Sequence, residues 1–197
     1  MIQVYHMFVL SFNIFVKMKQ SKGECIIMDN SEKNKYVTRE ITNAMLELLK
    51  EKDINEISIS EITSKARVGR VSFYRNYKNK EEILERYVFS IVKKWKNENE
   101  TENTLPNDLL KKLFEHILEY KQFYTILYQK KLFHIFRDVL KDTITSKKEP
   151  LSNIEAYATA FISYGIYGWI EEWLARGMKE SAEEIYTLLQ TQSGISK

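Results

Sequence analysis

The segment over residues 58–84 constrains the fold more than any other part of this chain. Ser58 is followed three residues later by Glu61, the capping-box pattern in which each side chain hydrogen-bonds the other residue's backbone amide. This pattern predicts a short helix over residues 59–65, then a tight turn and a second short helix over residues 70–76. Helices this short bury little apolar surface by themselves, so both need a third helix to pack against.

Residues 36–51 predict that third helix, because apolar side chains recur there at spacings near three and four. The apolar positions are Val37, Ile41, Ala44, Met45, Leu48 and Leu49. After the segment's second short helix, Asn79 is a favourable cap, and Glu81 and Glu82 suit the positive end of the next helix dipole. We expect that longer helix to run to about residue 97.

The distribution of charge indicates what these helices bind. The net charge of the chain is only +3, but residues 64–80 carry six basic side chains and no acidic one. The basic residues are Lys65, Arg67, Arg70, Arg75, Lys78 and Lys80. Such a patch is typical of a surface that contacts phosphates, with an ordinary solvated helix face as the alternative. A three-helix unit whose second short helix is basic predicts a helix-turn-helix, in which that helix lies in the major groove of DNA.

Helices are also expected through the rest of the chain, because its 197 residues include only two prolines and six glycines. Residues 96–103 contain no apolar side chain and predict a linker or a frayed helix end between two domains. Beyond them we expect helices over residues 106–120, 121–129, 131–144 and 151–176, and a last helix capped by Ser181. The predicted fold class is all-α, with an N-terminal three-helix helix-turn-helix domain, a C-terminal helical domain and about nine helices in all.

The segment over residues 58–84 resembles the DNA-binding domain of the TetR/AcrR family of bacterial transcriptional regulators. The residues that match the family pattern are Ser58, Ile62, Ala66, Val68, Phe73, Tyr74, Tyr77, Lys80 and Leu84. The resemblance implies a helix-turn-helix domain over residues 31–97 and an effector-binding and dimerisation domain over residues 104–197. It also implies that the chain is not an enzyme, and no nucleophile–base pair or carboxylate pair stands out in the sequence.

Three residues depart from the family pattern. Arg67 stands in the turn where the family usually has glycine, Gly69 stands where the recognition helix often begins with serine, and Thr63 replaces an alanine. A positive φ in the turn costs a residue other than glycine about 1 kcal/mol. Arg67 is therefore expected either to accept this strain or to change the turn.

The resemblance implies DNA contacts residue by residue. Arg70 is expected to donate two hydrogen bonds to a guanine, and Val71 to touch a thymine methyl group. Lys80 is expected to bind a phosphate together with amides at the start of the following helix. Contacts with the DNA backbone are also expected for Ser60, Arg67, Ser72, Tyr74, Arg75, Asn76 and Lys78. Solvation alone is the alternative for Arg75 and Lys78, and ordinary half-buried packing is the alternative for Tyr74. Phe73 and Tyr77 are expected in the core.

Residues 154–174 are unusually apolar for a surface helix, so they need cover on more than one side. They resemble the family's penultimate helix, which joins the last helix in a four-helix dimer interface. We therefore expect a two-fold contact between copies, formed by residues 157–173 and 181–190. The expected interface residues are Tyr164, Gly165, Gly168, Trp169 and Trp173. A helix buried entirely within one chain is the alternative.

Aromatic side chains are dense over residues 114–136. In the family the equivalent helices enclose an effector pocket, and tyrosine hydroxyls beside apolar walls would suit an unknown aromatic or amphipathic small molecule. The expected lining residues are Tyr120, Phe123, Tyr124, Tyr128, Tyr157 and Phe161, with ordinary core packing as the alternative. His116 and His134 have no neighbouring ligand pattern, so neither a metal nor a cofactor is expected.

The first 27 residues differ in character from the rest. They are apolar but interrupted by polar side chains, and fit neither a bilayer span nor a secretory signal. Residues 22–24 can be encoded by a ribosome-binding sequence at a suitable distance from Met28. We expect translation to begin at Met28, which would make residues 1–27 a non-native or disordered extension, with a peripheral membrane anchor as the alternative. Cys25 is the only cysteine, which excludes an intrachain disulfide and fits the cytoplasm.

These features together predict a cytoplasmic homodimer that binds double-stranded operator DNA, responds to a small-molecule effector and has no membrane partner. A repressor is the expected role, and an activator or co-activator of the same family is the first alternative. The second is a helical small-molecule-binding protein that no longer binds DNA. The acid-free basic run over residues 64–80 argues against this second alternative.

Overall fold

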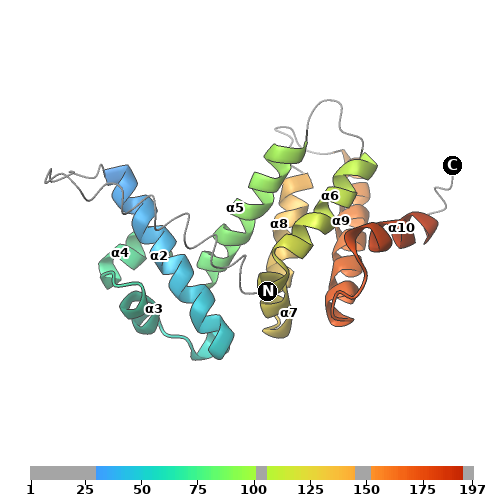
Figure 1. Ribbon diagram of the computed structural model, residues 1–197. Coiled ribbons are helices and arrows are strands. Elements are labelled where there is room, and N and C mark those ends of the chain that lie inside the picture. Colours follow the sequence, from blue (N-terminus) through green and yellow to red (C-terminus); the bar gives the residue numbers. More distant parts are fainter. Residues whose placement is uncertain (1–29, 101–105, 145–151, 193–197) are drawn as a thin grey trace, which may run out of the picture. The chain divides into compact units, whose positions relative to one another are not determined.

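The computed structural model of the chain describes residues 30–100, 106–144 and 152–192. Among these residues there are nine α-helices, one short 3-10 helix and no strand, so the predicted all-α fold is confirmed (Figure 1). The elements are α2 (Asn30–Glu51), η1 (Ile54–Glu56), α3 (Ile59–Lys65), α4 (Arg70–Asn76), α5 (Glu81–Asn99), α6 (Pro106–Glu119), α7 (Lys121–Gln129), α8 (His134–Ile144), α9 (Asn153–Ala175) and α10 (Ala182–Gln192). The predicted extension over residues 1–27 lies outside the described part of the chain.

The chain divides into two units between residues 35 and 36, inside α2. The second unit contains the remainder of α2 and every later helix. A continuous cluster of buried apolar side chains runs through this unit, from α2 to α10.

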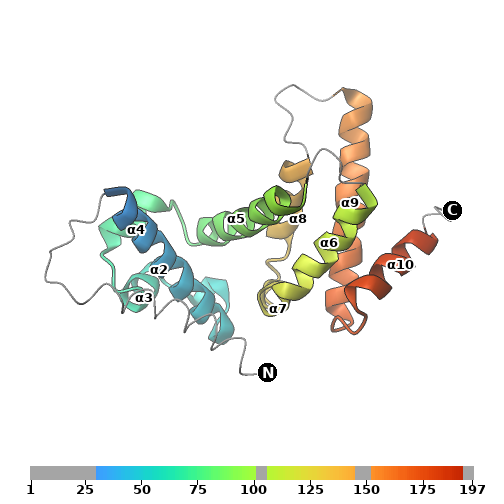
Figure 2. The same cartoon turned by 45° about the horizontal axis from the view of Figure 1, so that its top comes forward.

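Four helices contribute fully buried side chains to the N-terminal part of that cluster. They are Ile41 and Met45 in α2, Ile62 in α3, Phe73 in α4 and Leu84 in α5. Figures 1 and 2 show α2, α3 and α4 grouped together. Each buried side chain of this size contributes about 1.5–3 kcal/mol relative to an exposed one. The shared core therefore supplies the stability that two seven-residue helices lack by themselves.

The C-terminal helices pack through a second group of buried side chains. α8 contacts both α5 and α9, α7 contacts α9, and α10 contacts α6. Phe114, Tyr124, Phe136 and Trp173 are fully buried among them. The rings of Phe114 and Trp173 meet edge to face with centroids 5.7 Å apart, which joins α6 to α9.

α8 begins at His134, three residues later than the sequence pattern predicts. Lys131 follows α7 with a φ of +58°, and the amide of Leu132 donates to the carbonyl of Leu127 at 2.7 Å. This hydrogen bond belongs to a Schellman motif, which ends α7 and turns the chain before α8 starts. Glycine is the usual residue at such a position, as at Gly177 after α9, so a lysine there carries no signal of a helix end.

None of the described helices combines the length and the apolar character that crossing a bilayer requires.

Candidate nucleic-acid interface

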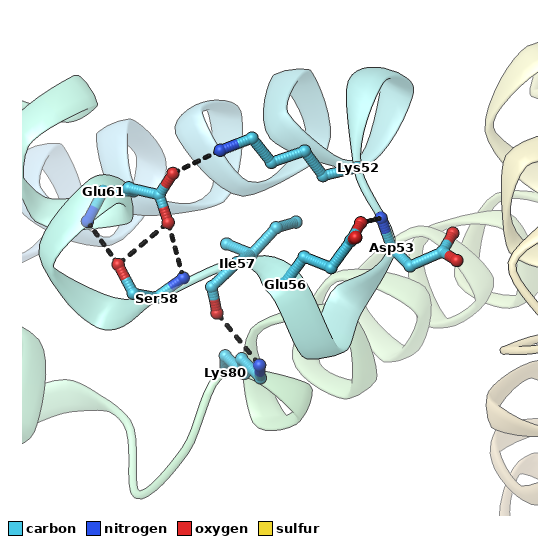
Figure 3. Close-up of polar contacts among 7 residues, drawn as sticks. All are labelled: Lys52, Asp53, Glu56, Ile57, Ser58, Glu61 and Lys80. Atoms are coloured by element: carbon cyan, nitrogen blue, oxygen red, sulfur yellow. Dashed lines mark hydrogen bonds and ion pairs between the residues drawn. The ribbon is translucent and has the colours of Figure 1, made fainter.

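α3 begins at the capping box that the sequence predicts. Ser58 Oγ accepts the amide of Glu61 at 3.2 Å, and Glu61 Oε2 accepts the amide of Ser58 at 2.9 Å. Glu61 Oε1 lies 2.5 Å from Nζ of Lys52, the residue after α2. The contact with Lys52, followed by those with Ser58, lowers the pKa of Glu61 to about 2. The start of α3 is thus linked to the end of α2 (Figure 3).

The turn between α3 and α4 is built on Arg67, whose φ is +55°. The amide of Val68 donates to the carbonyl of Thr63 at 3.0 Å, and the amide of Arg67 donates to that of Ser64 at 3.1 Å. This is the Schellman motif in which glycine usually stands at the position of Arg67. Of the two outcomes that the sequence left open, Arg67 accepts the strained conformation. Gly69 then caps α4 without a side-chain hydrogen bond.

α4 has one buried face and one exposed face. Phe73 and Tyr77 are buried as predicted, with ring centroids 5.8 Å apart, and the Tyr77 hydroxyl lies 3.4 Å from Thr42 Oγ1 in α2. On the opposite face Val71 is 72% exposed and Tyr74 is 60% exposed. Val71 and Tyr74 are thus an apolar and an aromatic side chain exposed on a basic helix, where they are suited to contact a binding partner.

Most of the ten predicted DNA-contacting residues are open to solvent. The exposed ones are Arg67, Arg70, Val71, Tyr74, Arg75 and Lys78, and the half-buried ones are Ser60, Ser72, Asn76 and Lys80. The guanidinium of Arg70 donates to Ser60 Oγ, so this pair joins the exposed sides of α3 and α4. Asn76 Nδ2 donates to the carbonyl of Ser72 at 2.8 Å, so one N–H of the Asn76 side chain is hydrogen-bonded within α4.

The start of α5 is organised by hydrogen bonds within the protein. Asn79 Oδ1 accepts the amide of Glu82 at 2.8 Å, as expected of the predicted cap. Glu82 Oε2 accepts the amide of Lys78 at 2.6 Å, and Glu82 Oε1 accepts from the guanidinium of Arg86 at 2.6 Å. These contacts, with the Lys78 amide first, lower the pKa of Glu82. The Lys78 amide, which precedes α5, is therefore already hydrogen-bonded to the carboxylate of Glu82.

The Lys80 side chain is directed into the protein. Its Nζ donates to the carbonyl of Ile57 at 2.9 Å (Figure 3). It also donates to the carbonyl of Ile54. Both carbonyls belong to η1 or its C-cap, a helix that the sequence analysis did not predict. The missed signal was Asp53, three residues before Glu56, because these two residues form a second capping box with the Asp53 amide 3.0 Å from Glu56 Oε2.

Three of the six aromatic residues expected in an effector pocket meet inside the C-terminal helices. Tyr124 is fully buried, Phe123 packs against its ring at 5.4 Å, and the half-buried Tyr120 lies 4.9 Å from the ring of His116. His116 Nε2 is 2.9 Å from the Tyr124 hydroxyl. Burial, with a smaller effect of Lys94, lowers the pKa of His116 to about 4. Tyr124 is thus part of the core, whereas Tyr120 and His116 also line a hollow of about 200 Å³ beside α5 and α6.

The other three aromatic residues lie elsewhere. Tyr128 lines a separate hollow of about 430 Å³ next to α7, α8 and α9. The residues around this hollow are Tyr128, Gln129, Lys131, Phe133, His134, Tyr167 and Glu171. Tyr157 and Phe161 are 79% and 82% exposed on α9, so the structure does not bring them to Tyr124.

The residues expected at a dimer interface divide between two environments. Tyr164, Gly165 and Gly168 are exposed and Trp169 is half-buried, but Trp173 is only 1% exposed because it packs in the core of its own chain. Large apolar side chains nevertheless remain exposed on α9 and α10. They are Ile154, Tyr157, Phe161, Ile162 and Tyr164 on α9, and Leu188 on α10.

Within the described residues, no three His, Cys, Asp or Glu side chains gather as a metal site would require.

Two family models match the sequence. Residues 41–87 match the model of bacterial regulatory proteins of the tetR family, and residues 105–192 match a model of a transcriptional regulator C-terminal region of the same group. Among curated proteins, none matches the sequence significantly.

Several solved structures are similar in fold. Lin0861 from Listeria innocua superposes with a TM-score of 0.68 at 14% identity, covering 86% of this chain and 94% of that one. A TetR transcriptional regulator from Streptococcus agalactiae gives 0.59 at 18% identity, with 82% and 96% covered. The dihydroxyacetone kinase operon activator DhaS gives 0.51 at 20% identity, with 79% and 93% covered. At these identities the similarity shows the fold alone.

Proposed function

The chain belongs to the tetR family of bacterial regulatory proteins and is therefore a DNA-binding transcriptional regulator, and we propose that it is a homodimeric, ligand-responsive repressor. In this proposal the protein acts in the cytoplasm, where it stays bound to an operator and represses transcription until a small molecule binds. The two copies of α4 would enter successive major grooves of a palindromic site.

The observation that carries this proposal is the exposed face of α4. Val71 and Tyr74 stand outside the core, although burying either one would stabilise an isolated protein. They are flanked by the exposed Arg70 and Arg75, in a run over residues 64–80 that contains no acidic side chain. Apolar and cationic groups on one short helix match the methyl groups, base edges and phosphates of a major groove.

Each exposed residue of this face is assigned a type of contact. Arg70, the first residue of α4, reads a guanine, and Val71 contacts a thymine methyl group. Tyr74 donates its hydroxyl to a phosphate. Further phosphate contacts come from the exposed Arg67, Arg75 and Lys78. The half-buried Ser60, Ser72 and Asn76, whose side chains are shorter, also donate hydrogen bonds to phosphates. Ser60 also holds the guanidinium of Arg70, so its hydroxyl orients the residue that reads the base.

The exposed apolar side of α9 supports the proposed homodimer. Tyr157, Phe161 and Tyr164 recur at spacings of four and three, which places them along one side of the helix. Gly165 and Gly168 have no heavy atom within 4 Å of where a Cβ would stand, so the chain's own packing does not require glycine there. A second copy whose α9 backbone approaches closely would account for both features.

The hollow beside α7, α8 and α9 supports the proposed response to a small molecule. Phe133 and Tyr167 stack with centroids 5.2 Å apart, and the Tyr167 hydroxyl donates to Glu171 at 2.5 Å. An aromatic wall beside a carboxylate suits an aromatic ligand with a cationic or hydroxyl group. Binding there would favour one of two dimer geometries and so change the affinity for DNA.

A gel-shift titration tests the proposal with the duplex that the wild-type protein enriches from a randomised pool. Arg70→Ala should weaken binding of that duplex by about 5- to 150-fold, the equivalent of 1–3 kcal/mol, and should relax the base preference at one position. Lys179→Ala, which removes an exposed charge after α9, is the matched control and should leave binding unchanged. Equal affinities for wild type and Arg70→Ala would remove Arg70 from the interface.

An activator is the second candidate, because one structural neighbour is described as an operon activator. A reporter fused to the selected operator separates the roles. Loss of the regulator should raise the output of a repressed promoter and lower that of an activated one.

A further inference from the structure

Lys80 has an ammonium group that the structure uses inside the helix-turn-helix. The expected phosphate site needs a free cation and free amides at the start of α5. Instead, the Lys80 ammonium is bound to the carbonyls of Ile54 and Ile57. The amide of Lys78 is bound by the Glu82 carboxylate, whose negative charge would repel a phosphate.

The Ile57 carbonyl needs such a donor. It lies at the C-cap of η1, where backbone carbonyls have no partner within the helix, whereas the Ile54 carbonyl also accepts the amide of Ile57 at 3.2 Å. The side chains of Ile54 and Ile57 are buried, which places this backbone against the core. A charged N–H group is a strong donor in such surroundings, because hydrogen bonds to charged groups contribute more than neutral ones.

The contact joins two elements that the interface depends on. Ile57 immediately precedes Ser58, the cap of α3, and Lys80 immediately precedes the first residue of α5. The ammonium therefore fixes the start of α3 to the start of α5, as Figure 3 shows around Ile57. The ion pair between Glu61 and Lys52 likewise fixes α3 to the end of α2. Polar contacts therefore hold the start of α3 to both α2 and α5.

We propose that Lys80 is a positioning residue, which sets the angle of α3 and hence of α4 by binding the carbonyls of Ile54 and Ile57, and that it does not neutralise a phosphate. The part of this proposal that concerns DNA rests on the proposed function. The part that concerns the tether stands on the protein alone.

Two substitutions at Lys80 and one at Lys78 separate a tether from a phosphate contact in the full-length chain. Lys80→Met removes both donor and charge, whereas Lys80→Gln removes the charge but keeps an N–H donor for a carbonyl. Lys78→Gln is the matched control, because Lys78 is an exposed neighbour assigned to phosphate. Urea unfolding is measured without DNA, and affinity for the selected duplex is measured against salt under conditions in which every variant remains folded.

The tether predicts a lower urea midpoint for Lys80→Met, with the folded-to-unfolded ratio reduced about tenfold or more, and a smaller loss for Lys80→Gln. Each Lys80 variant should bind DNA more weakly than wild type by the same factor at every salt concentration. Its slope of log K against log salt should therefore equal that of the wild type. Lys78→Gln should keep the wild-type midpoint and reduce the slope by about 0.9 for each protomer bound.

A reduced slope for both Lys80 variants, together with wild-type urea midpoints, would overturn the proposal. Failure of the wild-type protein to bind any duplex would refute the proposed function instead. In that case the urea midpoints would still decide whether Lys80 is a tether.

Discussion

The imidazole Nε2 of His116 and the hydroxyl of Tyr124 lie 2.9 Å apart within the buried packing of α6 and α7. Either atom can be the donor while the imidazole is neutral, and burial favours that state because it lowers the pKa of His116 to about 4. The tyrosine stays protonated, since burial raises its pKa well above the usual value. The burial of His116 therefore makes the stability of the chain depend on pH.

The first prediction concerns acid stability. Unfolded His116 takes up a proton near pH 6.5 but folded His116 does so near pH 4, so stability is complete above pH 6.5 and falls as the pH drops toward 4. The slope approaches about 1.4 kcal/mol per pH unit. Between pH 6.5 and about 5 the carboxylates whose pKa is lowered, such as Glu61, contribute little to the loss.

Urea unfolding at pH 7.5, 6.0 and 5.0 measures this slope. His116→Gln should flatten it over that interval, and His134→Gln, at an exposed histidine, is the control that should not. An unchanged slope in His116→Gln would contradict the assignment.

The second prediction concerns the turn residues with positive φ. Arg67→Gly should raise the free energy of unfolding by up to about 1 kcal/mol, because glycine adopts this conformation without strain. Lys131→Gly, in the same motif after α7, should give a similar gain. Only Arg67→Gly should also lower the salt slope of DNA binding, since only Arg67 is assigned a phosphate. No gain in either variant would show that these turns are not strained.

The third prediction concerns the exposed side of α9. Phe161→Asp should dissociate the homodimer, because it buries a charge at the centre of the proposed contact without touching the core of one chain. Phe89→Asp, at an exposed phenylalanine on α5, is the matched control. Sedimentation velocity should find wild type and Phe89→Asp as dimers and Phe161→Asp as a folded monomer. A dimeric Phe161→Asp would move the interface elsewhere.

Local signals in the sequence were sufficient for most of the α-helices. The capping box at Ser58 and the apolar periodicity around it predict α3 and α4 to the residue, since both depend on neighbours within one turn. η1 and the start of α8 were missed for local reasons as well. η1 begins at a second capping box, at Asp53, and Lys131 stands where glycine is the usual signal.

The directions of long side chains were beyond the sequence. The spacing of Trp169 and Trp173 places both on one side of α9, but only tertiary packing turns Trp173 toward Phe114 and leaves Phe161 exposed. Lys80 matches a family position, yet its ammonium binds the carbonyls of Ile54 and Ile57, which are more than twenty residues away in the sequence. Contacts of this kind depend on how the helices meet.

The most direct test of the account is selection of duplexes from a randomised pool by the full-length wild-type protein at low salt, followed by sequencing. Two copies of α4 on a symmetric dimer should enrich a palindrome whose half-sites lie about 10 base pairs apart, centre to centre, or a multiple of that spacing. A pool that stays random after repeated rounds, with protein that remains folded, would contradict the claim that α4 reads a major groove.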